Sequence, residues 1–179
     1  LSGGTSLKGF GKAAGIPSAT WASGGSLNTA RDQLAGAGTQ TLAIAFGGNA
    51  PPGNQVVTES YDGSSWTEVN DLNTARRKMG AGIQTAALGF GGNAPPGNQV
   101  ITESYNGSSW TEVGDMNTAR RKMGGAGLYT SALVFGGQGS STNMGETESW
   151  NGSAWSEVAD LNTSRKQVRG TGANNTSAI

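Results

Sequence analysis

A period of about 45 residues constrains this chain more than any other feature of its sequence. Four tryptophans recur 45, 44 and 45 residues apart, at Trp21, Trp66, Trp110 and Trp155. Between Gly47–Gly80 and Gly91–Gly124, 30 of 34 aligned residues are identical. Periods of this length are typical of solenoids and propellers, in which each unit completes its core only by packing against its neighbours. We therefore expect a single repeat domain over residues 1–179. Its units lie at about 1–46, 47–90, 91–135 and 136–179.

Each unit carries the pattern of four short strands. In one of them, the small-residue segments "KMGAGI" and "AALGFGG" flank a turn at Gln84–Thr85, and "VITESYNG" and "SSWTEV" follow. Asn106–Gly107 is typical of a type I′ hairpin turn, in which both central residues have positive φ. No segment longer than about ten residues shows a 3.6-residue apolar period, so the sequence predicts an all-β fold.

Composition and charge exclude several classes of function. Lys plus Arg and Asp plus Glu number 12 each, so the formal net charge is zero and nothing favours nucleic acid as a partner. No stretch approaches the roughly 18 apolar residues of a membrane span, so we expect no membrane insertion. The chain has no cysteine and no histidine, which removes disulfides, Cys/His metal sites and Ser-His or Cys-His catalysis. We expect neither a metal nor another cofactor.

The carboxylates also argue against catalysis. An active site needs an asymmetric set of groups, whereas these carboxylates recur at equivalent places in successive units. The repeated positions are Glu68, Glu112 and Glu157, with Asp71, Asp115 and Asp160. We interpret them as solvated faces of the sheets and expect a protein that is not an enzyme and has no catalytic residue.

The units resemble the kelch repeat, in which a hydrophobic strand ends in Gly-Gly and is followed by a tyrosine and a tryptophan. Phe90, Gly91–Gly92, Tyr105 and Trp110 carry that pattern here. The match covers residues from about 28 to 179, while residues 1–25 depart from it. The resemblance implies a β-propeller with one four-stranded blade per unit. The units are also similar to tandem segments in tail-fibre and adhesin-like proteins of phages and marine viruses.

The two ends of the chain are in phase with each other. Joined end to start, Thr176–Ile179 and Leu1–Gly4 reproduce the pattern "TSALVFGG" of the third unit. We therefore expect four blades in a closed ring, with a strand from residues 5–16 paired with one from 172–179. A fragment of a longer array and a two-chain, eight-bladed ring stay open as alternatives. In a ring, Trp66, Trp110 and Trp155 should be buried between blades.

Four arginines at one register position are the first candidate binding residues: Arg31, Arg76, Arg120 and Arg165. As a ring of guanidinium groups they could bind a phosphate, a sulfate or a sugar carboxylate. Alternatively, each pairs with a glutamate of the third strand in its own blade, namely Glu59, Glu103 or Glu148. The blade of Arg165 has Ala14 in place of that glutamate, so we expect Arg165 to be unpaired and the strongest anion contact, with Asn162 nearby.

The loop "NAPPGNQ" is the second candidate site. It occurs at Asn49–Gln55 and Asn93–Gln99, and a related loop spans Gln138–Glu146. Prolines limit the conformations of such a loop, and amides suit sugar hydroxyls, which makes Asn49, Asn93 and Gln138 candidates; the alternative is turn chemistry alone.

Repetition multiplies a weak surface site and gives avidity. The expected function is therefore a non-catalytic adhesion or receptor-binding module, with a surface glycan or a protein receptor as partner, in an extracellular or virion setting. A structural spacer, decoration or filament subunit is the alternative. The sequence leaves open a homo-oligomer or a place in a larger assembly.

Overall fold

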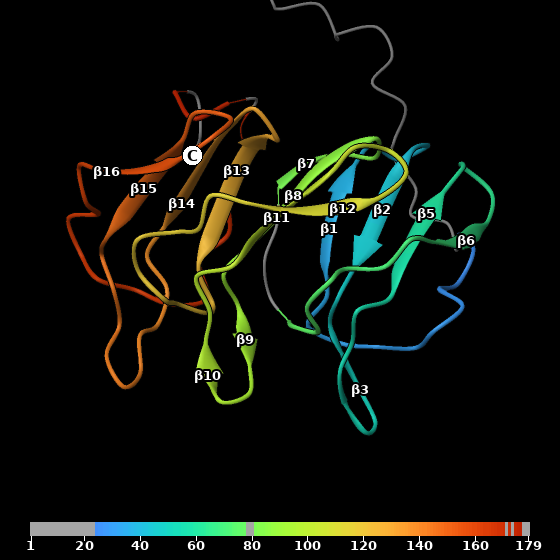
Figure 1. Cartoon of the computed structure of the whole chain (residues 1–179), viewed down its shortest axis with the longest axis horizontal. Helices are drawn as coiled ribbons and strands as arrows, with labels where there is room; N and C mark the ends of the chain where they lie inside the picture. Colours follow the sequence, from blue (N-terminus) through green and yellow to red (C-terminus); the bar gives the residue numbers. More distant parts are fainter. Residues whose placement is uncertain (1–23, 78–80, 171, 173, 177–179) are drawn as a thin grey trace, which may run out of the picture.

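The computed structural model describes residues 24–77, 81–170, 172 and 174–176, and over these ranges the chain is all-β (Figure 1). Three four-stranded antiparallel sheets and two small two-stranded hairpins make up the described structure, which contains no helix. The predicted all-β class is confirmed. In each sheet the strands follow chain order from one edge to the other, as alternating short apolar segments joined by turns require.

The first sheet has the order β1-β2-β5-β6. Its strands are β1 (Ala35–Gly38), β2 (Ala43–Phe46), β5 (Thr58–Tyr61) and β6 (Trp66–Val69). The second sheet consists of β7 (Ala81–Ile83), β8 (Ala86–Phe90), β11 (Thr102–Tyr105) and β12 (Trp110–Val113). The third consists of β13 (Gly124–Leu128), β14 (Ser131–Phe135), β15 (Thr147–Trp150) and β16 (Trp155–Val158).

A hairpin loop leaves the first and the second sheet between their two middle strands and projects from the same face of the molecule (Figure 1). The hairpins pair β3 (Asn49–Ala50) with β4 (Gly53–Asn54), and β9 (Asn93–Ala94) with β10 (Gly97–Asn98). The loop Gln138–Glu146 occupies the equivalent place in the third sheet. We call this surface the hairpin face. The predicted unit boundaries, set at the Gly-Gly pairs, therefore fall inside the sheets rather than between them.

The first strands of the three sheets lie together at the centre of the molecule, where β7 contacts both β1 and β13. Small residues make this approach possible. A Cβ added at Gly125 of β13 would lie only 2.6 Å from Cζ of Phe90, so an alanine there would collide with the ring. The glycine-rich segments noted in the sequence are thus the inner strands.

The turns agree with the sequence in position but not always in type. Ile83 pairs with Ala86, which leaves the predicted two-residue turn at Gln84–Thr85. Tyr105 pairs with Trp110, however, so the loop at Asn106–Gly107 has four residues and the predicted type I′ turn is wrong. The Asn106 side-chain oxygen accepts hydrogen bonds from the N–H groups of Ser108 and Ser109, both at 2.9 Å. This local bonding stabilises the longer loop instead.

Tryptophans fill the spaces between neighbouring sheets. The Trp110 ring lies 4.7 Å from that of Phe46 in the first sheet, and the Trp155 ring lies 5.1 Å from that of Phe90 in the second. Each is 6 % exposed, so burial between sheets is confirmed for these two. Trp66 is only half-buried: its ring lies 5.0 Å from that of Tyr61 in the same sheet, and the position equivalent to Phe46 in the preceding unit falls within residues 1–23, outside the described ranges.

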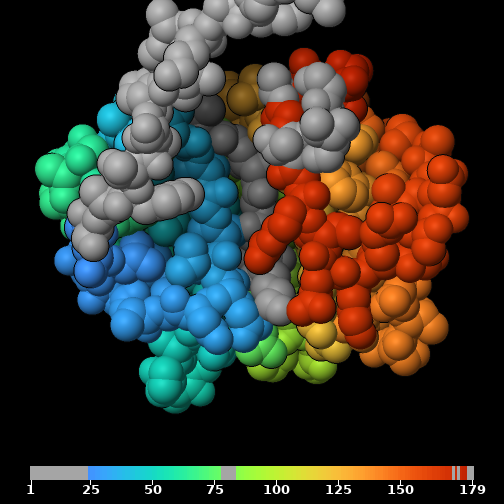
Figure 2. Space-filling view, turned by 180° about the vertical axis from the view of Figure 1, so that it is seen from behind, coloured from blue at the N-terminus to red at the C-terminus, as the bar shows by residue number. Residues whose placement is uncertain are grey.

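The predicted strand pair between residues 5–16 and 172–179 also falls largely outside the described residues. Figure 2 shows the first described residues in blue and the last ones in red on one side of the molecule. Both segments line one cavity there, as described below.

Candidate functional site

The repeated Asn-Thr-Ala-Arg segment of each sheet is bound to a buried glutamate on the third strand. The ion pairs are Arg31–Glu59, Arg76–Glu103 and Arg120–Glu148. Arg76 Nη2 lies 3.1 Å from Glu103 Oε1, and the side chains of all three pairs are fully buried. The predicted pairing is confirmed. Because these guanidinium groups are enclosed, the interpretation of them as an open ring for anions fails for these three arginines.

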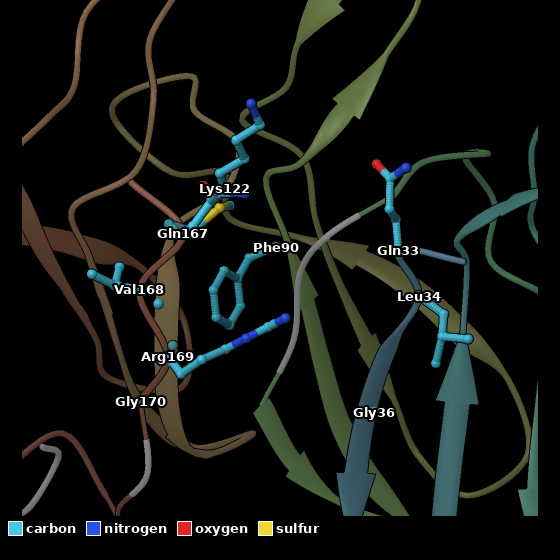
Figure 3. A pocket seen from close by; sticks show the side chains of 12 residues that line it. Gln33, Leu34, Gly36, Phe90, Lys122, Gln167, Val168, Arg169 and Gly170 are labelled. Atoms are coloured by element: carbon cyan, nitrogen blue, oxygen red, sulfur yellow. The ribbon is translucent and has the colours of Figure 1, made fainter. Parts of the chain in front are cut away.

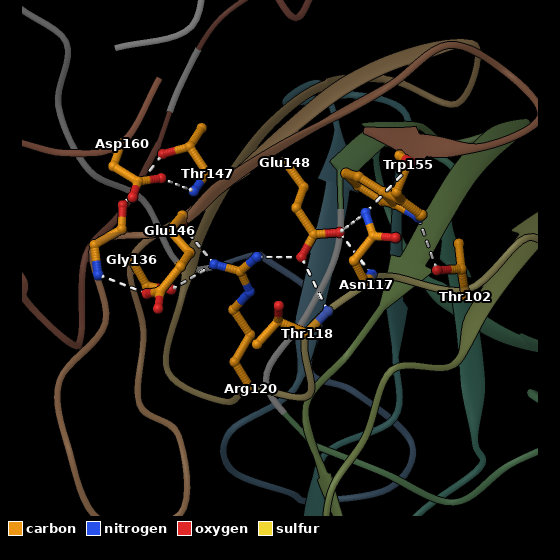
Figure 4. Close-up of polar contacts among 11 residues, drawn as sticks. Thr102, Asn117, Thr118, Arg120, Gly136, Glu146, Thr147, Glu148, Trp155 and Asp160 are labelled. Carbon is orange, nitrogen blue, oxygen red and sulfur yellow. Dashed lines mark hydrogen bonds and ion pairs between the residues drawn. The ribbon is translucent and has the colours of Figure 1, made fainter. Parts of the chain in front are cut away.

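Each glutamate binds the preceding loop as well as the arginine, as Figure 4 shows for Glu148. Glu148 accepts hydrogen bonds from the N–H of Asn117 at 2.7 Å, from Asn117 Nδ2 at 3.0 Å and from the N–H of Thr118 at 3.3 Å. The carboxylate therefore satisfies several donors of a loop that has no sheet partner of its own. This arrangement explains why asparagine, threonine and arginine recur together.

Opposing effects set the charge state of these pairs. Burial disfavours the Glu59 carboxylate, but hydrogen bonds from the Asn28 N–H, the Arg31 side chain and the Thr29 N–H outweigh burial and lower the pKa of Glu59. Burial lowers the pKa of Arg76, and the charge of Glu103 opposes that effect. An arginine titrates so far above neutrality that Arg76 stays charged at pH 7 despite its burial.

Arg165 occupies the same register as the paired arginines but a different environment. The Gly137 N–H donates to its carbonyl oxygen at 2.8 Å, just as the Gly92 N–H donates to that of Arg120 at 2.9 Å. Its side chain is exposed, and Nε donates to the Thr163 carbonyl at 3.2 Å. Within the described part of the chain, Arg165 forms no ion pair, and Asn162 is likewise exposed. Anion binding by Arg165 stays a prediction.

The candidate amides of the hairpin face are held by a second set of arginines. Arg77 donates to Asn93 Oδ1 at 3.1 Å and to Asn49 Oδ1 at 3.4 Å, so one guanidinium joins two neighbouring hairpins. Arg121 donates in the same way to Gln138 Oε1 at 3.4 Å. A guanidinium only donates, so each amide must turn its oxygen toward the arginine and its NH₂ group away. Three register-equivalent amides are thereby brought to one face with the same orientation.

Lateral hydrogen bonds fix the hairpins relative to one another. Asn54 Nδ2 donates to the Asn93 carbonyl at 2.7 Å, and Asn98 Nδ2 donates to the Gln138 carbonyl at 2.9 Å. Within the first hairpin, Gln55 Nε2 donates to the carbonyls of Ala50 and Gly53. The hairpin face is therefore a bonded surface rather than a set of independent loops.

A cavity of about 440 Å³ lies among the starts of the inner strands, and we call it the central cavity (Figure 3). Its charged and amide side chains come from Gln33, Lys122, Gln167 and Arg169, and the Phe90 ring forms part of its wall. The sequence analysis missed these residues. A usable signal existed for Arg169, because it stands 45 residues after Gly124, at a position where the other units carry Gly or Ala.

The described residues contain no group of three or more His, Cys, Asp or Glu side chains arranged to hold a metal ion. Among the same residues there is no helix long and apolar enough to cross a membrane. Comparison of the chain with protein-family models gave no match. Comparison with curated proteins gave none either.

Proposed function

We propose that the chain is a non-catalytic binding module, a kelch-like β-propeller of four blades whose hairpin face recognises surface glycans. The observation that carries this proposal is the row of equivalent amides of Asn49, Asn93 and Gln138. Each turns its NH₂ group away from the arginine that holds its oxygen, and none of these NH₂ groups has a hydrogen-bond partner among the described residues. Such donors suit the oxygens of sugar hydroxyls and carboxylates.

The arrangement of the hairpin face favours repeated rather than single contacts. The tips carry the exposed prolines Pro51–Pro52 and Pro95–Pro96, which limit the conformations of the loops before binding. Weak equivalent sites on one rigid surface engage a repetitive ligand with an avidity above that of each site. Adhesion to a glycan-bearing surface, in an extracellular or virion setting, is the role that uses this geometry.

The ends of the described chain support a fourth blade. A Cβ on Gly25 would lie 2.7 Å from the carbonyl oxygen of Ser64, and one on Gly114 would lie 2.6 Å from that of Ser153. These two glycines stand at the same place in the repeat. Gly114 follows β12, the outermost strand of the second sheet, and packs on the third sheet. The segment around Gly25 packs on the first sheet in the same way.

The C-terminal segment packs on the third sheet in the corresponding way. Asn175 Nδ2 donates to Ser149 Oγ at 2.8 Å, as Gln84 Nε2 of the second sheet donates to Ser60 Oγ of the first at 2.9 Å. These contacts support the proposal that residues near 25 and near 175 form the end and the beginning of one further blade. The native mass tests this part of the proposal: an 18.0 kDa monomer agrees with a four-bladed ring, and a stable dimer supports the eight-bladed alternative.

A glycan array tests binding through the hairpin face. In the double variant Asn49→Asp/Asn93→Asp, the oxygen that accepts from Arg77 is kept and both outward NH₂ groups are lost. We expect this variant to lose glycan binding while it retains the wild-type midpoint of unfolding.

The control carries the same added charge elsewhere. Asn106→Asp/Asn151→Asp alters two exposed turns, and the equivalent turn of the first sheet already has Asp62. It should bind as the wild type does. Wild-type protein that binds no glycan and instead assembles into filaments would refute the proposal and support the structural alternative.

A further inference from the structure

The central cavity carries positive charge without a carboxylate to offset it. Among the described residues, Lys122 and Arg169 line it, and no Asp or Glu does. In the described residues neither side chain takes part in a hydrogen bond or an ion pair, in contrast to the buried arginines, each of which has its own glutamate. An arginine without a carboxylate keeps its planar set of donors for another anion.

Figure 3 shows how these groups lie. The Arg169 side chain extends beneath the Phe90 ring into the cavity, whereas the side chains of Lys122 and Gln33, on either side of it, point upward in this view rather than toward Arg169. Phe90 itself is held by its contact with Trp155, with ring centroids 5.1 Å apart. The volume of about 440 Å³ falls within the range of small-ligand sites. The cavity thus offers two cations and an apolar wall to one compact ligand.

The backbone around the cavity is strained in a repeated way. Gln33, Lys122 and Gln167 have φ angles of 55°, 57° and 59°, in the left-handed region that favours glycine. They stand at one register position, and the equivalent Lys78 lies outside the described residues. Residues held in this conformation are strained, and such residues cluster at ligand sites. Here the conformation places long polar side chains, rather than glycine, at the cavity.

Arg169 makes this site single rather than repeated. Its register equivalents in the first and third sheets are Ala35 and Gly124, which bring no charge to the cavity. The Gln167 N–H donates to the Lys122 carbonyl at 2.7 Å, which holds the segment of Arg169 beside the third sheet. One chain therefore has one such arginine, whereas the amides of the hairpin face recur from sheet to sheet.

We propose that the central cavity binds one compact oxyanion per chain, with Arg169 as the principal contact and Lys122 as the second. Carboxylate, sulfate and phosphate groups share the chemistry that these side chains recognise: two or more acceptor oxygens around one negative centre. The amides of Gln33 and Gln167 are placed to contact hydroxyl groups of the molecule that carries the anion. This site is separate from the hairpin face and goes beyond the proposed function.

Calorimetric titration at low ionic strength tests the site with four probes: glucuronate, inorganic sulfate, inorganic phosphate and, as the neutral match of glucuronate, glucose. We expect saturable binding of at least one anion with one site per chain, and none of glucose. The anion that binds best identifies which oxyanion the cavity prefers.

Two variants assign the binding to the cavity. Arg169→Gln should weaken binding roughly tenfold or more, the loss expected for one charged hydrogen-bonding partner. Lys166→Gln removes one positive charge three residues earlier, outside the cavity, and should leave affinity unchanged. Urea midpoints of both variants should equal that of the wild type, because both side chains are exposed.

Several results would overturn this assignment: wild-type protein that binds none of the three anions, equal binding of glucose and glucuronate, or equal losses in the two variants. The glycan-array result for the hairpin face is independent of each of them. Failure of one proposal is therefore distinguishable from failure of the other.

Discussion

Replacing Glu148 by glutamine should lower the free energy of unfolding more than any substitution on the exposed surface does. Glutamine keeps the length of the side chain but removes its charge, which leaves Arg120 buried without a counter-ion. It also brings an NH₂ donor toward the donors of Asn117 and Thr118, so part of the loop loses its acceptor. Breaking one side of a buried ion pair costs about 3–5 kcal/mol, a large share of the 5–15 kcal/mol of typical domain stability.

Urea unfolding followed by tryptophan fluorescence measures this loss. With a slope of about 2 kcal/mol per molar urea, the expected cost lowers the midpoint by about 2 M. Glu157→Gln is the matched control, because Glu157 lies directly opposite Glu148 in the sheet but is exposed. That change should stay within about 0.5 kcal/mol of the wild type.

A double variant separates the buried charge from the loss of shape. Arg120→Met/Glu148→Leu removes both charges together and should be less destabilised than Glu148→Gln, since no uncompensated ion is left. A loss below about 1 kcal/mol in Glu148→Gln would refute the argument that this pair holds the loop. Equal losses in Glu148→Gln and Glu157→Gln would do the same.

Two further predictions concern burial and pH. Trp110→Ala should lower the free energy of unfolding by about 3–5 kcal/mol, and Trp66→Ala by roughly half as much because its ring is only half-buried; equal losses in urea unfolding would contradict this difference. Hydrogen bonds from the N–H groups of Ser65 and Ser64 lower the pKa of Asp62 to about 2. Its contribution to stability is therefore complete above the unfolded pKa near 4 and is lost as pH falls through about 2. Asp62→Asn keeps the accepting oxygen, so the wild type should lose stability relative to this variant between pH 4 and 2, and parallel pH profiles would contradict the assignment.

Because the units repeat, much of the fold can be predicted from the sequence. Register alone predicts glycine and alanine in the inner strands, tryptophan between sheets and a glutamate beside each buried arginine. The reason is that a repeated residue has the same surroundings in each unit. The four-residue length of the loop at Asn106 could not be predicted from the sequence, because the Asn-Gly dipeptide fits two loop lengths and the strand pairing decides between them.

The central cavity escaped prediction for the opposite reason. Its principal cation, Arg169, belongs to a single unit, whereas a comparison of positions shared by all units leads to Arg165 instead. The left-handed backbone at Gln33 and Lys122 has no signature in residue type, because glycine is absent there. An asymmetric site in a symmetric chain is found by looking for the position where one unit departs from the others.

The self-contained ion pairs of the sheets have a consequence for how such a chain can grow. Because each buried arginine finds its carboxylate within its own sheet, a gene duplication that copies one whole sheet copies both charges together. The new copy buries no orphaned ion and does not depend on a mutation in its neighbour to become stable. Unit number can therefore change in a single genetic event, with selection acting afterwards on the exposed loops.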